Sequence, residues 1–287
     1  MRDLRVKVNE IELAVRDYPC EGEAIVFLHF CTGNLMMWQP VVPFLQDHYH
    51  LILVDLRGHG KSDKPESGYH IDEMAADVVG VMRHLNVARA HLVGSSLGAE
   101  VALSIAANHP DMAISLVCEG AFNSEYGPYS AWQGSRAEFE AYVAEELQKI
   151  RGRPVNAFPT IDAFLQSRQE KLEQCGAWNA YFEAMERYDA SMTAGGEFTR
   201  ALRKQNLESY MAQYFETRFE DYYPRVQCPI LALPAEEEMN SEPERAAMEK
   251  MMRWQKMLRL RPSQVGNTPS AGCSILKRLA RSFSNFC

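Results

Sequence analysis

The sequence predicts an α/β protein with a doubly wound, mostly parallel sheet that is interrupted by a helical insertion. Three observations predict this fold class. Short apolar segments alternate with helical patterns through residues 1–121, strand patterns are absent from residues 122–224, and an apolar segment returns at residues 228–234. Because this last segment is typical of a buried strand, the insertion interrupts one sheet and does not begin an independent second domain.

The first elements of the sheet come from the N-terminal segments. Residues 4–17 alternate apolar and polar side chains around Asn9, which is typical of an antiparallel hairpin at a sheet edge. Residues 24–30 and 50–56 are nearly continuous apolar segments, as expected for strands buried on both faces of a parallel sheet. Between them, residues 36–47 are predicted to form a crossover helix.

The alternation of strands and helices continues along the chain. Residues 71–85 repeat apolar side chains at helical spacing, which predicts a helix. Residues 90–95 are a short apolar segment, which predicts a buried strand. Residues 97–110 are predicted to form a helix that ends at a proline, and residues 113–118 to form another strand. This order favours parallel strands joined by right-handed crossovers.

Four parts are therefore expected along the chain. Residues 1–121 form the first part of the core, and residues 122–224 form a helical insertion that lies as a lid above the strand ends. Residues 225–251 complete the core, and residues 252–287 form an atypical basic tail.

Composition limits the possible functions. With 287 residues, 46% of them hydrophobic, the chain can bury a large core. A net charge of −8 gives no electrostatic reason to expect nucleic acid or a membrane as partner, so a small-molecule substrate is expected. No apolar segment approaches a signal sequence or a membrane span, which predicts a cytoplasmic protein. Seven cysteines without a CxxC pair predict no metal site, and no cofactor is expected.

One motif carries the candidate chemistry. Gly94-Ser95-Ser96-Leu97-Gly98 matches G-x-S-x-G and lies between a predicted strand and a predicted helix, which is the context of a nucleophile elbow. Such a turn strains the serine backbone and exposes its hydroxyl, so Ser96 is the candidate nucleophile. The Leu97 amide opens the helix, where it can stabilise a developing oxyanion. A Gly/Ser turn without chemistry is the alternative.

Two further loops extend this pattern. Residues 29–34 (HFCTGN) follow the first long strand, and residues 55–62 (DLRGHGKS) follow the second. Together with the elbow they resemble the α/β-hydrolase superfamily, over about residues 20–120 and again at residues 228–238. The resemblance implies an enzyme that hydrolyses small ester or related acyl substrates through a serine nucleophile.

The resemblance also implies roles for individual residues. The family usually has His-Gly-x in its first loop, so the second oxyanion donor maps to the Cys31 amide, with Phe30 in place of the glycine. The Cys31 thiol is interpreted as a wall of the pocket. The family commonly has Gly-x-x-Asp after its late strand, which places the orienting acid at Glu238, with Glu236 as the close rival. Glu119 is either a displaced acid or a pocket-lining residue.

The general base is missing from its expected place. All eight histidines lie between His29 and His109, whereas the family places its histidine after the last strand. His59, in the second loop, is interpreted as structural. Without a base, Ser96 is an ordinary alcohol at neutral pH, and losing one triad member costs several orders of magnitude in turnover. We therefore expect either an impaired hydrolase or a catalytically inactive ligand-binding protein of the same fold.

The C-terminal tail differs from the rest of the chain. Residues 250–287 contain eight Lys and Arg but no Asp or Glu, and residues 259–273 show no strand pattern. Three interpretations are open: a shift of the reading frame after about Met252, a basic extension that contacts an acidic partner or membrane, and an end without a role. Loss of the last strand would also expose an unpaired sheet edge and favour poor folding.

Overall fold

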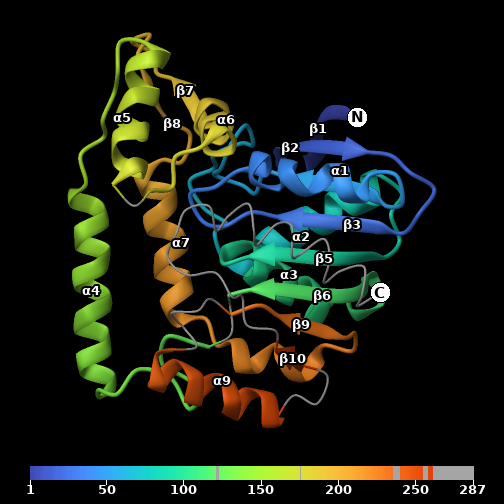
Figure 1. The fold of residues 1–287 in the computed structure, drawn as a ribbon. Coiled ribbons are helices and arrows are strands. Elements are labelled where there is room, and N and C mark those ends of the chain that lie inside the picture. Colours follow the sequence, from blue (N-terminus) through green and yellow to red (C-terminus); the bar gives the residue numbers. More distant parts are fainter. Residues whose placement is uncertain (121–122, 175, 235–239, 255–257, 261–287) are drawn as a thin grey trace.

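The computed structural model describes residues 1–120, 123–174, 176–234, 240–254 and 258–260. Its centre is a sheet with the strand order β1-β2-β4-β3-β5-β6-β9-β10 (Figure 1). Strand β2 is antiparallel to β1 and β4, and all other neighbouring strands are parallel. The mostly parallel, doubly wound sheet predicted from the sequence is therefore confirmed. The strands are β1 (Arg2–Val8), β2 (Ile11–Tyr18), β3 (Ala24–Leu28), β4 (His50–Val54), β5 (Ala90–Ser95), β6 (Ala113–Glu119), β9 (Ile230–Ala232) and β10 (Leu258–Leu260).

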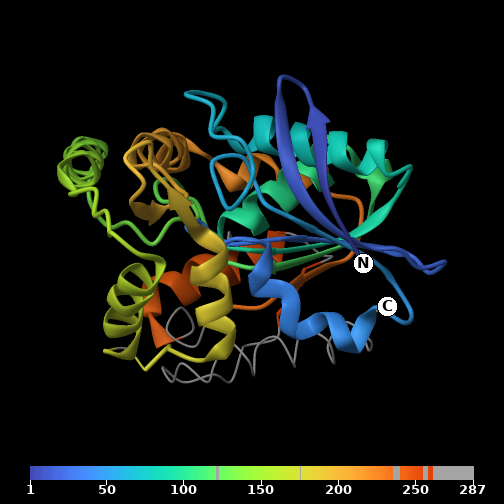
Figure 2. The ribbon, with the colours of Figure 1, turned by 90° about the horizontal axis from the view of Figure 1, so that it is seen from above.

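Helices cover both faces of this sheet. Figure 2 shows α2 and α3 on one face and α1 on the other. Successive residues of β3 enter different cores: Val26 and Leu28 pack with α2 and α3, whereas Ile25 and Phe27 pack with Trp38. Burial of both faces explains the continuous apolar segments in the sequence. The core helices are η1 (Leu35–Val41), α1 (Val42–Leu45), α2 (Ile71–His84), α3 (Leu97–Asn108), η2 (Pro110–Met112) and α9 (Glu242–Trp254).

The first crossover differs from the single helix expected at residues 36–47. The chain instead forms the 3-10 helix η1, which contains Pro40, and then the short helix α1, which has Pro43 in its first turn. Proline lacks the backbone N–H that a continuing α-helix needs, so the segment cannot form one unbroken helix.

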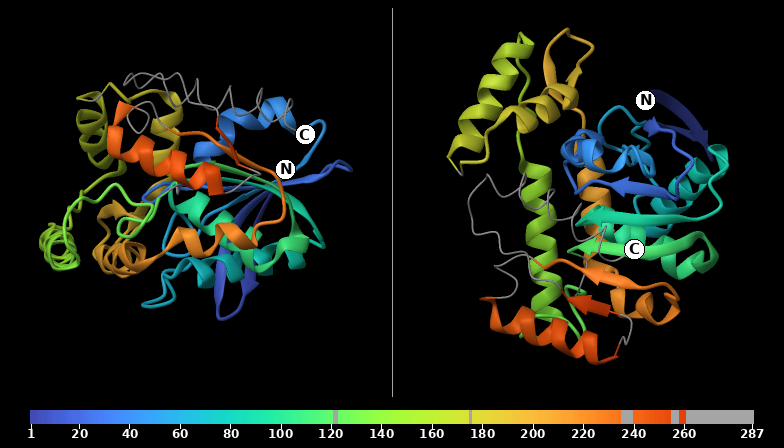
Figure 3. Two further views of the ribbon diagram at one scale, coloured as in Figure 1. Left: turned by 90° about the horizontal axis from the view of Figure 1, so that it is seen from below. Right: turned by 45° about the vertical axis from the view of Figure 1, so that its right-hand side comes forward.

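The chain between β6 and β9 forms an inserted segment. Figure 3 shows α4 running alongside α7, with α5 and α6 toward one end of this pair. The two short strands β7 and β8 pair with each other, and the sequence did not predict them because three residues are too few for a periodic pattern. The segment contains α4 (Arg136–Gly152), α5 (Ile161–Glu173), α6 (Ala180–Asp189), β7 (Ala190–Met192), β8 (Phe198–Arg200), α7 (Lys204–Glu216), η3 (Phe219–Asp221) and η4 (Tyr223–Arg225).

The start of the tail departs from the expectation of a loop. Strand β10 pairs in parallel with β9, with Leu258 opposite Ile230 and Leu260 opposite Ala232. The prediction that no strand lies over residues 259–273 is therefore wrong at its first two residues. A three-residue strand at the edge of a sheet needs backbone pairing on one side, and it leaves no long apolar segment for a sequence pattern to show. Residues 261–287 lie outside the described residues, so the interpretations of the tail stay predictions.

No described helix is both long enough and apolar enough to cross a lipid bilayer.

Candidate active site

The turn between β5 and α3 has the geometry of a nucleophile elbow. Ser96 has φ 48° and ψ −118°, a backbone conformation that non-glycine residues rarely adopt. Its carbonyl accepts hydrogen bonds from the amides of Ala99 (2.7 Å) and Glu100 (3.0 Å), which begin the helix. Ser96 is exposed, whereas Ser95 is buried at the end of β5. The strained turn therefore presents the hydroxyl of Ser96 to solvent and that of Ser95 to the interior.

Two glycines allow the strand and the helix to approach closely. A Cβ atom on Gly94 would lie 2.2 Å from the carbonyl oxygen of Gly98. A Cβ atom on Gly98 would lie 2.1 Å from the carbonyl oxygen of Leu28, at the end of β3. Both distances are far inside van der Waals contact, so the G-x-S-x-G spacing is required by packing at this junction.

The loops that hold the two predicted oxyanion donors leave the same edge of the sheet. Strands β3 and β5 are parallel neighbours in which Leu28 pairs with Gly94. Cys31 follows β3 and Leu97 follows β5, so the topology brings the two loops together. Within the described residues, neither amide has a recorded hydrogen-bond acceptor. The first-turn amide of Leu97 has no intrahelical acceptor available to it.

The Cys31 loop turns at an unexpected residue. Phe30 stands where the resemblance implies glycine, and its ring lies against Gly33, whose amide donates to the Phe30 carbonyl at 2.9 Å. The left-handed backbone conformation falls instead on Thr32, with φ 70°. Burial raises the pKa of the Cys31 thiol to about 12, so the thiol is protonated at neutral pH and is a poor nucleophile.

Glu119 lies directly behind the elbow. Its carbonyl accepts a 2.6 Å hydrogen bond from the Ser96 amide, and its carboxylate accepts one from the Ser95 hydroxyl. Burial raises the pKa of Glu119. These contacts tie the end of β6 to the elbow, so Glu119 supports the turn through its backbone and through Ser95.

Two histidines, His29 and His59, lie in the loops that follow β3 and β4, and they differ in their hydrogen bonds. His29 accepts a 3.0 Å hydrogen bond from the Leu56 amide, and its other nitrogen contacts the Phe30 carbonyl at 2.8 Å. His59 contacts the Arg57 carbonyl through Nδ1 at 2.9 Å, and its buried Nε2 has no hydrogen-bond partner among the described residues. Burial lowers the pKa of His29 to about 3 and that of His59 to about 4. Both rings are therefore neutral and packed against each other, with centroids 5.0 Å apart.

The other six histidines lie elsewhere. His70 caps the N-terminus of α2, where its ring accepts a hydrogen bond from the Asp72 amide at 3.2 Å. His109 follows α3 and lies about 20 Å along the helix from Ser96. No described histidine is hydrogen-bonded to Ser96, in agreement with the absence of a histidine at the family position. The other five are His48, His50, His84, His91 and His109.

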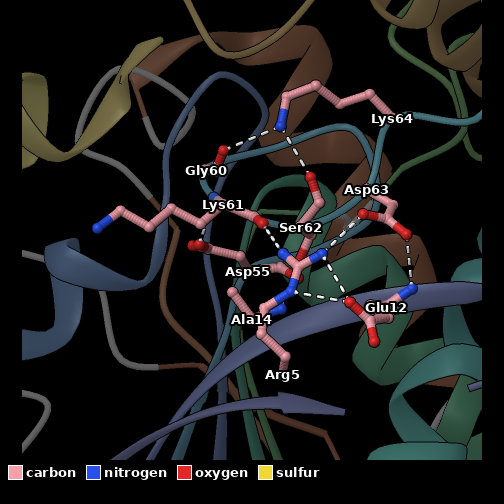
Figure 4. A network of polar contacts seen from close by, with 9 residues as sticks. All are labelled: Arg5, Glu12, Ala14, Asp55, Gly60, Lys61, Ser62, Asp63 and Lys64. Atoms are coloured by element: carbon pink, nitrogen blue, oxygen red, sulfur yellow. Dashed lines mark hydrogen bonds and ion pairs between the residues drawn. The ribbon is translucent and has the colours of Figure 1, made fainter. Parts of the chain in front are cut away.

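The loop at residues 55–62 is held by structural contacts. Figure 4 shows its polar network with the β1–β2 hairpin. The buried Ser62 hydroxyl donates to the Asp55 carbonyl (2.6 Å) and accepts from the Ala14 amide (2.8 Å). Asp55 accepts from the amides of Leu35 (2.7 Å) and Lys61 (2.9 Å), and burial raises its pKa to about 6. Its carboxylate is therefore used to shape the turn.

This network supports a prediction about stability. Ser62→Ala leaves two buried backbone groups without partners and is expected to lower the free energy of unfolding by about 2–3 kcal/mol. Arg5→Ala, which removes half-exposed ion pairs to Glu12 and Asp63 in the same network, is expected to cost less than about 1 kcal/mol. Urea unfolding of both variants measures the contrast. Equal losses would show that the exposed pairs hold the loop.

Glu100 belongs to none of the motifs in the sequence. This residue lies one turn after Ser96 in α3. It is only 2% exposed, and almost all other residues of the helix are also buried. The Tyr210 hydroxyl of α7 donates to it at 2.9 Å. Burial raises the pKa of Glu100 to about 8, so the side chain is mostly neutral at pH 7. A charged residue inside an apolar helical pattern was the signal that could have identified it.

The predicted acid follows strand β9 in the sequence. Glu238 and its rival Glu236 lie outside the described residues, although β9, which precedes them, is parallel to β6 and ends at the same edge as the elbow. Among the described side chains, no group of three or more His, Cys, Asp or Glu could hold a metal ion.

Comparison with known proteins identifies the family. A family model described as the alpha/beta hydrolase fold matches residues 23–239. A 2-(acetamidomethylene)succinate hydrolase from Mesorhizobium japonicum is 33% identical over 164 residues, which are 55% of this chain and 57% of that protein. A 3-oxoadipate enol-lactonase from Acinetobacter baylyi is 32% identical over 110 residues, 38% of this chain and 41% of the relative. The matched segments thus cover less than two thirds of either relative.

A solved structure shares the fold over nearly its whole length. The crystal structure of an E-2-(acetamidomethylene)succinate hydrolase superimposes with a TM-score of 0.76 at 24% identity, covering 99% of this chain and 98% of that one. Together with the family model and the elbow geometry, this shows that the chain belongs to the alpha/beta hydrolase fold family.

Proposed function

We propose that this protein is a serine-nucleophile hydrolase that acts on small ester or related acyl substrates. The observation that carries the proposal is the conformation of Ser96: an exposed hydroxyl on a strained turn at the N-terminus of a buried helix. A structural Gly/Ser turn has no need to hold a serine at φ 48° with its side chain in solvent.

The proposed reaction follows from the groups at the carboxyl edge of the sheet. The Ser96 Oγ attacks the acyl carbon, and the amides of Leu97 and Cys31 donate to the oxygen that becomes negative. Collapse of the tetrahedral intermediate breaks the bond to the leaving oxygen, which takes a proton from solvent to become the alcohol. The acyl-serine that remains is then hydrolysed by water. Glu238, or its rival Glu236, is the acid proposed from the resemblance.

The chain has no histidine after His109 to take the Ser96 proton, so that proton passes to solvent in the proposed reaction. We therefore expect turnover several orders of magnitude below that of a complete triad. The oxyanion donors and substrate binding supply what rate remains.

The inserted segment is consistent with the proposal that the substrate is small and enclosed. Helix α7 and the preceding strand β8 contact α3 and the Cys31 loop through Tyr210 and Arg200, so this segment is proposed to act as a lid. The relatives are named for hydrolysing a succinate derivative and an enol-lactone of 3-oxoadipate, which supports a small-molecule substrate.

A catalytically inactive, ligand-binding protein of the same fold is the second candidate. His29 is hydrogen-bonded through both ring nitrogens, and no described histidine is hydrogen-bonded to Ser96, which favours this second candidate.

Two measurements on the intact chain distinguish the hydrolase from the binding protein. One is hydrolysis of p-nitrophenyl acetate, p-nitrophenyl butyrate and a simple lactone, and the other is the shift in melting temperature that these compounds cause. Turnover above the buffer rate, with an acyl-serine adduct detected by mass spectrometry, supports the hydrolase. Ligand-induced stabilisation without turnover or adduct supports the binding protein.

A further inference from the structure

The strain in the Cys31 loop is concentrated at one residue. Thr32 has φ 70°, and a β-branched side chain in the left-handed region is a genuine outlier. Such a conformation persists only where surrounding contacts hold it. The residue follows Cys31 directly, so the conformation of Thr32 sets the direction of the preceding peptide groups.

A side chain from the inserted segment provides that contact. Arg200, the last residue of β8, donates from Nη2 to the Thr32 carbonyl at 2.7 Å. Its Nε donates to Asp189 at 2.9 Å, and the Asp189 side chain is only 3% exposed. The planar guanidinium thus joins a buried carboxylate of α6 to the strained peptide, with a geometry that lysine cannot reproduce.

Helix α6 also holds the far end of the loop. Asn34, which is buried, donates to the Met185 carbonyl at 3.0 Å and caps η1 through the Met36 amide. Helix α6 therefore contacts the loop directly at Asn34 and, through the pair of Asp189 with Arg200, indirectly at Thr32.

We propose that Arg200 is a positioning residue that holds Thr32 in its left-handed conformation and thereby orients the Cys31 amide as an oxyanion donor. The proposal rests on the proposed function where it concerns catalysis. The contact between Arg200 and Thr32 itself can be tested without any activity.

Three variants test the proposal by kinetics: Arg200→Met, Thr32→Gly and the double variant. Glycine adopts φ 70° without strain, so it removes the need for the arginine. With the neutral substrate p-nitrophenyl acetate, Arg200→Met is expected to lower kcat about tenfold while KM changes less than twofold, since the donor is misplaced and not removed. In the Thr32→Gly background the same change is expected to lower kcat threefold or less.

Arg168→Met is the matched control. Arg168 pairs with the buried Glu186 of α6 at 2.8 and 3.0 Å and has no recorded contact with the Cys31 loop. Arg168→Met is expected to lower the melting temperature without the loss of kcat that is expected for Arg200→Met. A rise in KM at constant kcat in Arg200→Met would show that Arg200 binds substrate directly and would overturn the proposal, as would equal kcat losses in both backgrounds.

Thermal unfolding of the same variants tests the contact between Arg200 and Thr32 even if the intact chain shows no turnover. The decrease in melting temperature caused by Arg200→Met is expected to shrink to less than half in the Thr32→Gly background, whereas that of Arg168→Met stays unchanged. Such coupling without turnover would support the positioning contact and reject the proposed hydrolase. Additive shifts for Arg200→Met and Thr32→Gly would reject the positioning role.

Discussion

Ser96→Ala is expected to abolish the slow covalent labelling of the chain by a fluorophosphonate probe, leaving only the background of the method. The probe reacts only with a nucleophile whose tetrahedral adduct is stabilised by nearby donors, and Ser96 is the serine that the elbow exposes. Hydrolysis of p-nitrophenyl butyrate is expected to fall to the buffer rate. Intact mass and peptide mapping of the labelled chain measure the site.

Ser95→Ala is the matched control, because Ser95 is adjacent in sequence but buried and bonded to Glu119. It is expected to keep labelling within about tenfold of the unaltered chain, since it removes a supporting contact and not the nucleophile. Loss of labelling in Ser95→Ala with retention in Ser96→Ala would reverse the assignment. Labelling of neither serine in the unaltered chain would favour the inactive binding protein.

Glu100→Gln is expected to stabilise the protein, increasingly with pH. Burial raises the pKa of Glu100 to about 8 from its usual 4.5. Between these values the unfolded chain releases the proton and the folded chain retains it, so this group's contribution to stability falls as pH rises from about 4.5 to about 8. Glutamine keeps the acceptor for Tyr210 and cannot ionise. The expected gain at pH 9 is on the order of 3–5 kcal/mol.

Urea unfolding at pH 5, 7 and 9 measures this effect as the difference between variant and unaltered chain. Other buried acids, such as Asp55, titrate in both proteins and cancel in the comparison. Glu66→Gln, at an exposed position, is the control and is expected to change stability by less than about 0.5 kcal/mol at every pH. A difference for Glu100→Gln that does not vary with pH would mean that Glu100 does not titrate in this range.

Local patterns were sufficient for most of the core. The hairpin around Asn9, which has φ 50° in the structure, and the buried strands β3 to β6 lie where the apolar segments predicted them. These elements are buried on one or both faces, so apolar residues recur along the sequence at the spacing of the strand or helix. The crossover at η1 and the strands β7, β8 and β10 were missed because they are short or proline-containing and depend on pairing with distant residues.

The candidate site was likewise predictable only in part. The G-x-S-x-G spacing and its place between a strand and a helix predicted Ser96 as the nucleophile, and the close packing of Gly94 and Gly98 explains why the motif has this spacing. The resemblance to the family then suggested roles for Cys31 and Glu238. Neither the positions of these two groups relative to the serine nor their catalytic roles follow from spacing, and Glu238 lies outside the described residues.

The sequence by itself thus determined the α/β fold class, the candidate nucleophile and the lack of a late histidine, because each depends on residues close together in the chain or on composition. Only the tertiary structure decided that Glu100 is buried against Tyr210 and that Arg200 reaches the carbonyl of Thr32. These pairs are 110 and 168 residues apart, and contacts at such separations are created by packing of the inserted segment on the core, which no local pattern encodes.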